Sequence, residues 1–316
     1  MAPLPLGLHY GIADDTYHAD PAPVPSLSST LARLILDRSP LHAWWAHPRL
    51  NPDFEPVERK TFDIGRAAHR AVLGAGSDYV AIPHEILASN GAASTKAAKE
   101  FIEQARASGL TPLKAAEVDQ IGEMRVKVHQ RLDEMGIVLD SACSEAVVLA
   151  DISGTTCRVM IDNAPRDPAQ ALYDFKTTTD ASPEHCTRAV MNYGYDVQAA
   201  FYLDAWKATT GEDRAFRFIF QEKEAPFEVC IVELSGDDLD IARKKTRRAR
   251  EIWQQCLTSG RWPGYPAGVH RIELPGWFTE RWLERESAES DFRRRHGHDV
   301  LDQARRWQAP LNIAAE

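Results

Sequence analysis

The segment at residues 171–183, "ALYDFKTTTDASP", places an acid and a lysine two residues apart, at Asp174 and Lys176. Its aromatic and β-branched residues predict a strand, in which residues two apart face the same side. Asp174 and Lys176 therefore project together, while Tyr173 and Phe175 project to the opposite, buried face. Taken alone, an Asp-x-Lys pair is usually a solvated ion pair that contributes little free energy.

A second carboxylate favours a chemical interpretation of this pair. The stretch "SEAVVLADISGTTCRVMIDNAP" predicts a hairpin that turns at Gly154, and Asp162 ends its second strand. Neighbouring antiparallel strands place facing residues about 5 Å apart, so Asp162, Asp174 and Lys176 would form one cluster. Two adjacent carboxylates repel each other and need a cation, and their oxygens suit Mg²⁺ or Mn²⁺. A lysine beside them can orient or deprotonate water, or hold a phosphate oxygen, as metal-assisted hydrolysis of a phosphodiester requires.

The elements that must position these groups predict an α/β (α+β) fold, with a mixed central sheet flanked by helices. Helical periodicity precedes the hairpin, and helices and strands alternate after it. The expected helices are 61–73, two within 93–135, 184–209 and 237–257, and the expected strands are the hairpin, 171–177, 215–223 and 226–234.

Composition and cysteine spacing exclude several classes of protein. The chain has 316 residues, of which 44% are hydrophobic and 26% charged, as in ordinary globular proteins. No apolar run reaches the roughly 18 residues that a membrane helix needs, and no signal-peptide pattern opens the chain. The five cysteines are scattered, which argues against a structural zinc, an iron–sulfur cluster or a disulfide framework and favours a reducing cytoplasm.

The charge is unevenly distributed. A formal net charge of -9 counts mildly against nucleic-acid binding, but residues 243–250 read "RKKTRRAR". The basic residues considered for DNA are Arg243, Lys244, Lys245, Arg247 and Arg248. A solvated basic face and a phosphate-binding track are both open interpretations.

These residues resemble a known family. Asp162 followed by Asp174-Phe175-Lys176 resembles the signature of the PD-(D/E)XK nucleases. "GRAAH", which ends in His69, and "QAAFYLDA", with Gln198 and Tyr202, resemble two helix motifs of their RecB-like branch. "HYGIADDTYH", "LSSTLARLILDRSPLHAW", "FDIGRAAHRAVLG", "YDVQAAFYLDA" and "WPGY" resemble the exonuclease VIII (RecE) nuclease domain of phages and prophages, from about residue 8 to residue 278. Each motif alone is weak, but five in the right order are specific.

The resemblance implies roles for individual residues. His69, Asp162 and Asp174 would bind the metal, with the Phe175 carbonyl as a further ligand, and Lys176 would be the catalytic lysine. Gln198 and Tyr202 would face the site and position DNA or the lysine. Glu145 would supply a carboxylate for a second metal, unless it is an exposed strand acid. The hydroxyls of Thr177 and Thr178 could donate to a DNA phosphate, although β-propensity explains both threonines equally well. The proline that precedes the first Asp in the superfamily is replaced by Ile161.

The resemblance also implies an activity: processive 5′-to-3′ digestion of one strand of linear duplex DNA, which leaves a 3′ single strand for recombination. Mg²⁺ would be the cofactor, with Mn²⁺ able to substitute and no iron–sulfur cluster. A ring-shaped homo-oligomer and a single-strand annealing protein would be the partners. The alternatives are a non-catalytic DNA-binding or assembly subunit that keeps the fold, and a nuclease of different polarity such as an endonuclease.

The expected organisation is one nuclease domain and a tail. The domain spans residues 1–278, with a helical part at 1–140 and the catalytic motifs at 61–73 and 143–235. The tail at 279–316 is charged and helical, and it would serve as an oligomer contact, a partner-docking helix or a solvated helix.

Overall fold

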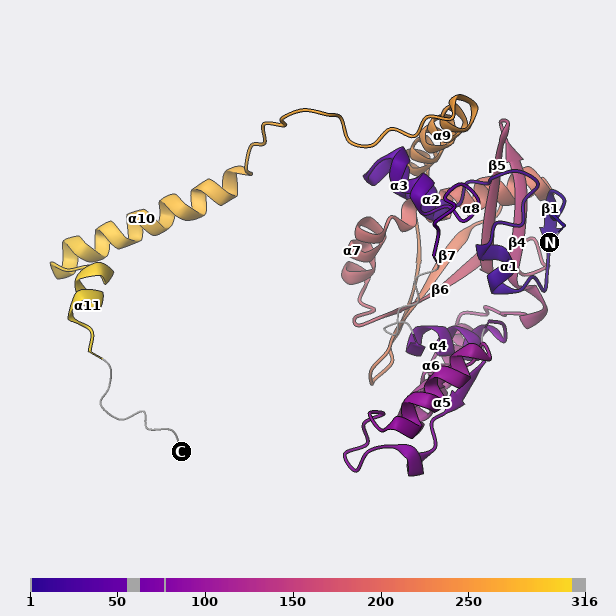
Figure 1. The fold of residues 1–316 in the computed structure, drawn as a ribbon, viewed down its shortest axis with the longest axis horizontal. Coiled ribbons are helices and arrows are strands. Elements are labelled where there is room, and N and C mark those ends of the chain that lie inside the picture. The colour runs from indigo at the N-terminus through magenta and orange to yellow at the C-terminus, as the bar shows by residue number, and fades with distance from the viewer. Residues whose placement is uncertain (1, 56–62, 77, 309–316) are drawn as a thin grey trace. The chain divides into compact units, whose positions relative to one another are not determined.

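The computed structural model in Figure 1 describes residues 2–55, 63–76 and 78–308. These residues form two compact units, Met1–Tyr265 and Pro266–Glu316. The expected boundary after residue 278 falls within a helix of the second unit. Residues 61 and 62 of the expected helix 61–73 lie outside the described residues.

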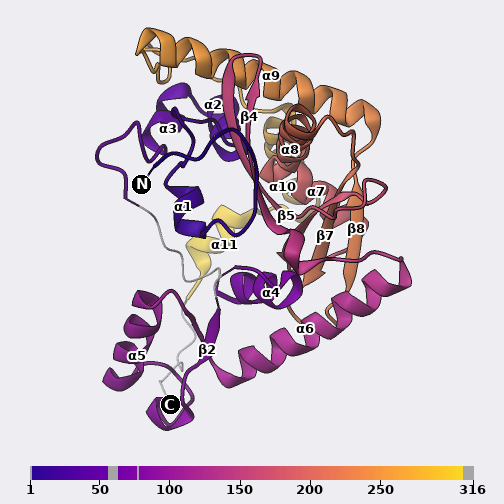
Figure 2. The same cartoon turned by 90° about the vertical axis from the view of Figure 1, so that its right-hand side faces the viewer.

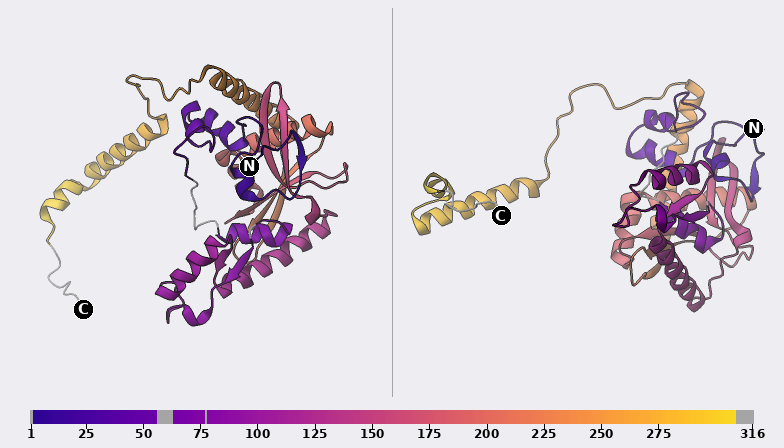
Figure 3. Two further views of the ribbon diagram at one scale, coloured as in Figure 1. Left: turned by 45° about the vertical axis from the view of Figure 1, so that its right-hand side comes forward. Right: turned by 60° about the horizontal axis from the view of Figure 1, so that its bottom comes forward.

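The first unit contains the strands and most of the helices. Its strands are β1 (Gly7–His9), β2 (Tyr79–Ala81), β3 (Thr111–Leu113), β4 (Ser144–Ile152), β5 (Thr155–Asn163), β6 (Leu172–Thr178), β7 (Phe216–Glu222) and β8 (Val229–Glu233). Its helices are α1 (Asp14–His18), α2 (Ser29–Asp37), α3 (Pro40–Trp45), α4 (Asp63–Leu73), α5 (Lys96–Ala107), α6 (Ala115–Glu134), α7 (Pro183–Tyr193), α8 (Tyr195–Thr210) and α9 (Gly236–Ser259). The described part of the second unit holds α10 (Gly276–His296) and α11 (Val300–Arg306), coloured yellow in Figure 3.

The central sheet is mixed, as the sequence predicts. Its strand order is β1-β4-β5-β6-β7-β8, and β6 and β7 are parallel while the other neighbours are antiparallel. The hairpin of β4 and β5 turns at Gly154, whose φ of +80° suits glycine. β1 is an edge strand that hydropathy did not predict, because three residues are too few to show alternation. β5 and β6 pair only at Asn163 and Tyr173, so their ladder ends beside both aspartates.

Helices cover both sides of these strands. In Figure 2, α8 and α9 lie toward the top and α4 and α6 toward the bottom, with the sheet between them. Val159, Phe218 and Trp253 belong to the core on the α8 side, whereas Tyr173 and Phe175 pack with residues of α4 and α6. Alternate residues of β6 therefore pack on opposite sides of the sheet, which confirms the alternation predicted for this strand.

The helix expected over 184–209 is interrupted. Gly194, with φ +65°, ends α7 and begins α8, and a β-carbon there would lie 2.5 Å from Cδ of Arg33. Hydropathy does not show such a break, although Gly194 is itself a residue type that commonly ends a helix. All five cysteines are free. None of the described helices is long and apolar enough to cross a membrane.

Candidate active site

Asp162 and Asp174 face each other where β5 and β6 separate. The pairing of Asn163 with Tyr173 makes them the next opposed positions. At this position the Asp162 side chain takes the place of a backbone-to-backbone hydrogen bond between the strands. Its Oδ2 accepts a hydrogen bond from the backbone N–H of Phe175 at 2.7 Å. In a strand the N–H and C=O of one residue project to the same side, so the Phe175 carbonyl also points to this gap. Its role as a metal ligand stays a prediction.

α4 brings a histidine to the first aspartate. His69 Nε2 lies 3.3 Å from Oδ2 of Asp162. One turn earlier, a β-carbon on Gly65 would lie only 3.2 Å from Oγ1 of Thr177 on β6. Residues four apart share a helix face, so the glycine allows α4 to approach β6 and the same approach delivers the histidine. This gives the spacing in "GRAAH" a physical reason.

The second aspartate is held by the other two predicted groups. The Lys176 ammonium forms an ion pair with Oδ1 of Asp174, and Nε2 of Gln198 on α8 donates to Oδ2. Asp174 is 1% exposed, and its Oδ1 has no partner with hydrogen-bond geometry besides this ion pair. The structure thus links His69 to Asp162, and Lys176 and Gln198 to Asp174, and the hydrogen bond from the Phe175 N–H to Asp162 joins the two groups.

The ionisable side chains of this site shift one another's pKa values. Burial, reinforced by the nearby Asp162, raises the pKa of Asp174 to about 6. Burial opposes ionisation of Asp162 as well, but His69, Lys176 and the Phe175 N–H outweigh it and lower its pKa. Burial disfavours the Lys176 ammonium, yet both aspartates outweigh this cost and raise its pKa. At neutral pH the lysine is therefore a protonated hydrogen-bond donor, and of the two aspartates Asp174 is the one whose ionised form is less stabilised.

Two further carboxylates lie near His69. Glu145 occupies the β4 position opposite Asp162 in the hairpin register, with φ +50°, and it is partly buried rather than exposed. Burial raises the pKa of Glu145, and the charges of Asp14 and Asp162 add to the rise. Asp14, on α1, pairs with His18 at 3.1 Å. Sequence reasoning missed Asp14, although it lies inside the quoted motif "HYGIADDTYH".

The chemical types of the donor side chains in this site suit a hard divalent cation. Asp162, Asp174 and His69 supply oxygen and nitrogen donors, and a cation would favour the ionised form of Asp174 against the burial and the Asp162 charge that raise its pKa. In the described residues, however, no three His, Cys, Asp or Glu side chains already form a group that could hold a metal ion. A bound cation would have to compete with Lys176 for Asp174.

Two of the predicted site residues, Tyr202 and Thr178, make contacts with other parts of the protein. Tyr202 is 8% exposed, and its ring packs edge-on against Phe216 at 5.7 Å. Its hydroxyl is near Ser29, and burial raises its pKa well above the ordinary value. Tyr202 thus packs in the core on the α8 side, where the charges of Asp174 and Asp162 add to this rise, and its role in positioning DNA or the lysine stays a prediction. The hydroxyl of Thr178 is bonded to the backbone of Asp180.

Lys176 also has an unpredicted neighbour. Its Nζ lies 5.0 Å from the ring centroid of Tyr195, within cation–π range. Tyr195 stacks on Phe218 at 5.4 Å, which holds the ring in place. The sequence offered one signal, since Tyr195 precedes Gln198 by three residues on the same helix face.

The basic stretch on α9 is mostly paired with acids. Arg243 contacts Asp204 of α8 at 3.5 Å and Asp240 at 3.3 Å, and Lys245 contacts Asp196 at 2.6 Å. Arg248 pairs with Glu251 at 3.1 Å. The interpretation of all five residues as a DNA track is thereby weakened, because three of them have neighbouring acids. In the described parts of the chain, Lys244 and Arg247 are exposed and have no ion pair.

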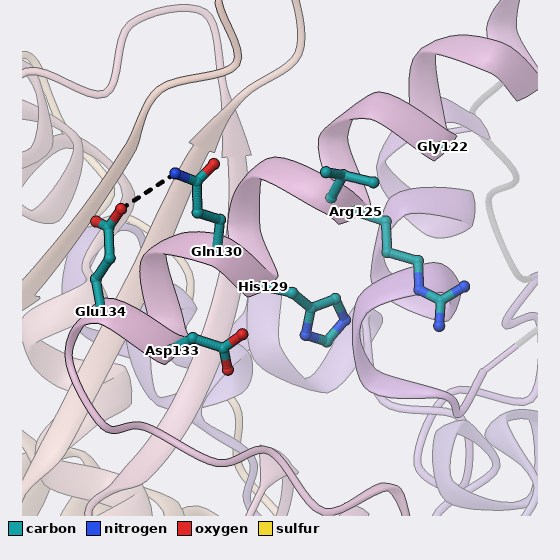
Figure 4. Close-up of a pocket in the computed structure, with 7 residues that line it drawn as sticks. Gly122, Arg125, His129, Gln130, Asp133 and Glu134 are labelled. Carbon is teal, nitrogen blue, oxygen red and sulfur yellow. Dashed lines mark hydrogen bonds between the residues drawn. The ribbon is translucent and has the colours of Figure 1, made fainter.

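A hollow of about 600 Å³ lies away from this chemistry, on α6 (Figure 4). Every residue that lines it belongs to this one helix: Gly122, Arg125, Val126, His129, Gln130, Asp133 and Glu134. Gln130 donates to Glu134 at 3.2 Å, within the same helix. A single helix face provides no opposing wall, so we assign no site to it.

Comparisons with known proteins agree with this geometry. A family model described as a PDDEXK-like domain of unknown function (DUF3799) matches residues 40–273, which include His69, Asp162, Asp174, Lys176 and Gln198. The crystal structure of a candidate exonuclease from Eubacterium rectale aligns with a TM-score of 0.53 and 13% identity, covering 82% of this chain and 97% of that chain. It supports a shared fold. Among curated proteins, a sequence search finds no match.

Two other solved structures align less well. A phage-related exonuclease from Haemophilus somnus 129PT has 9% identity and a TM-score of 0.29, covering 64% of this chain and 83% of that chain. An alkaline exonuclease from Laribacter hongkongensis has 12% identity and a TM-score of 0.26, covering 64% and 95%. Both scores are too low to add to the fold argument. The family match and the fold together support a nuclease.

Proposed function

Because this chain belongs to the DUF3799 family of PDDEXK-like domains, we propose that it is a Mg²⁺-dependent exonuclease that hydrolyses linear double-stranded DNA. One observation carries the proposal: His69, Asp162, Asp174 and Lys176 meet where β5 and β6 separate. Carboxylates that face each other, a histidine and a protonated lysine are the groups that phosphodiester hydrolysis requires.

The residues divide the chemistry among them. His69, Asp162 and Asp174 would hold Mg²⁺, or Mn²⁺ in its place. When bound, the ion would lower the pKa of a water and offset charge on the phosphate. Lys176, whose pKa is raised, donates a hydrogen bond to the water or to a phosphate oxygen. Gln198 keeps the Asp174 carboxylate in its orientation.

The direction and setting of the reaction rest on resemblance. The motifs similar to exonuclease VIII support 5′-to-3′ digestion that leaves 3′ single strands for recombination. The same resemblance supports a ring-shaped homo-oligomer and an annealing partner, and the scattered cysteines support a reducing cytoplasm. The tail at 279–316 would then be free for an oligomer or partner contact.

The test is digestion of duplexes labelled at either the 5′ or the 3′ end in Mg²⁺, with circular DNA as the control. Wild-type protein should release the 5′ label early, spare circles and lose activity in EDTA. Lys176→Ala should lower the rate by about 10²- to 10⁴-fold, as expected when a proton-transfer group is removed. Intact linear DNA with both proteins would refute a nuclease, and cleaved circles would indicate an endonuclease.

A second candidate is a non-catalytic DNA-binding or assembly subunit that keeps the fold. One observation favours it, namely that the described residues contain no ready three-ligand group. Calorimetric titration with Mn²⁺ separates the two. The nuclease should bind the ion, and Asp174→Ala should abolish most of the heat, whereas equal or absent heat in both proteins would favour the second candidate.

A further inference from the structure

A series of aromatic rings leads from the core to the surface beside Lys176. Phe218 of β7 stacks on Tyr195 at 5.4 Å with an interplanar angle of 30°. Tyr195 in turn lies 5.7 Å from Tyr193, at 39°. Phe218 is fully buried, whereas Tyr193 is 57% exposed. The series therefore ends in a ring with solvent on its outer side.

The same series touches the catalytic lysine. Tyr195 has the Lys176 ammonium 5.0 Å from its ring centroid, and Lys176 pairs with Asp174. Tyr193 is thus separated from the lysine by a single ring. A substrate group lying on Tyr193 would be a near neighbour of the phosphate that Lys176 contacts.

The exposed ring is presented by a fixed backbone. Tyr193 is the last residue of α7, and Gly194 follows with φ +65°. The side chain of Arg33 packs directly on Gly194, and its Nη1 donates to the carbonyl of Tyr193 at 2.5 Å. A residue on a mobile loop would lose more conformational freedom on binding than one held in this way.

We propose that Tyr193 stacks with a nucleobase of the DNA strand being cut, an inference that rests on the proposed nuclease function. Tyr195 lies tilted against the ring at 5.7 Å, and 57% of Tyr193 is exposed, which leaves room for one flat group to pack on it. Inside a duplex each base is already stacked on both sides, whereas the base at the end of a strand has one free face. The occupant is therefore the base at the strand end, paired or frayed, and aromatic stacking accepts any base.

Binding and cleavage measure the energetic part of this proposal. Tyr193→Ala should weaken binding of a frayed linear duplex in EDTA by about 5- to 100-fold and raise KM similarly, with kcat little changed. Tyr193→Phe should behave like wild type, because the ring alone is needed. Tyr193→Leu keeps apolar bulk without a ring and should resemble Tyr193→Ala. Met191→Ala is the control, since Met191 is 67% exposed two residues earlier and faces another direction.

Photocrosslinking locates the base. Duplexes carrying 5-iodouracil at successive positions from the end are bound in EDTA, irradiated and mapped by peptide mass spectrometry. The adduct should form on Tyr193 at one or two terminal positions and persist in Tyr193→Phe. If wild type binds and cleaves DNA but gives no adduct on Tyr193, or if Tyr193→Leu binds like wild type, stacking is refuted while the nuclease stands. If wild type neither binds nor cleaves, both fail.

Discussion

The strand segment Asp174-Phe175-Lys176 and the helical stretch "RKKTRRAR" are both charged, but the fold treats them differently. In β6, Asp174 is 1% exposed, and its carboxylate contacts the Lys176 ammonium and the Gln198 amide. On α9, Lys245 keeps 48% of its side chain exposed while it pairs with Asp196. A buried charge is costly to retain without a chemical use, whereas an exposed ion pair costs and contributes little.

The two regions differ in whether their charged residues bring candidate functional groups together. The strand pair brings together groups from α4, β5, β6 and α8, and it leaves the pKa of Asp174 raised to about 6. The helical stretch mainly connects α9 to α8 through Asp196 and Asp204. A short buried pattern therefore predicts more than a long exposed one. Substitutions in each region test this contrast.

The largest effect is expected from Asp174→Asn. The amide keeps an oxygen to accept from Gln198 but removes the charge that pairs with Lys176 and would hold a cation. Nuclease activity should fall by about 10³-fold or more, since a metal ligand and a lysine partner are lost together. The unfolding free energy should change by about 1 kcal/mol or less, because removing a crowded carboxylate offsets the lost ion pair.

The checks are a label-release assay and urea denaturation of the two proteins. A large loss of stability in Asp174→Asn would mean that the charged pair mainly supports the fold. Retained activity would show that the β6 pair is as incidental as an exposed ion pair.

Gly65→Ala should have an intermediate effect. Its β-carbon would lie 3.2 Å from Oγ1 of Thr177, so Thr177 or α4 must give way by a few tenths of an ångström, and a shift of α4 would carry His69 away from Asp162. We expect activity to fall by about 10-fold, because small displacements in a site are costly.

Gly122→Ala is the matched control for Gly65→Ala. Gly122 lies within α6, and a β-carbon there meets nothing within 4 Å. Alanine at an unstrained helical position should raise the unfolding free energy by about 0.5–1 kcal/mol and leave activity unchanged. Equal activity of the two variants in the label-release assay would show that the close approach of α4 to β6 is not needed.

Much of the fold and the core of the site follow from sequence, because they depend on local periodicity. Alternation predicts the hairpin and β6, and strand parity places Asp174 beside Lys176. The resemblance then adds His69 and Gln198, whose contacts with the aspartates are observed. Their assignment as metal-binding and positioning residues stays a prediction.

The remainder depends on tertiary packing, which periodicity does not contain. Tyr202 shares a helix face with Gln198, yet the depth of α8 in the core turns its ring to Phe216. Asp14 approaches the His69 region from a short helix far away in sequence. The break at Gly194 arises because Arg33 occupies the space of a β-carbon. Each depends on a neighbour distant in the chain.

The smallest effects are expected on α9, where two sets of substitutions can be compared. Arg243→Gln, Lys245→Gln and Arg248→Gln together remove residues that already have acidic partners. We expect the slope of log Kd against log salt to change by less than one unit and the unfolding free energy to fall by about 1 kcal/mol.

The second set, Lys244→Gln with Arg247→Gln, removes the two basic residues for which the described residues show no ion pair. The slope of log Kd against log salt should then fall by about two, because each phosphate contact contributes about 0.9. Fluorescence anisotropy at several salt concentrations measures both sets. If the ion-paired set lowered the slope more than the set without ion pairs, the paired α9 residues would contact DNA even though each has an acidic neighbour, and the contrast with β6 would fail.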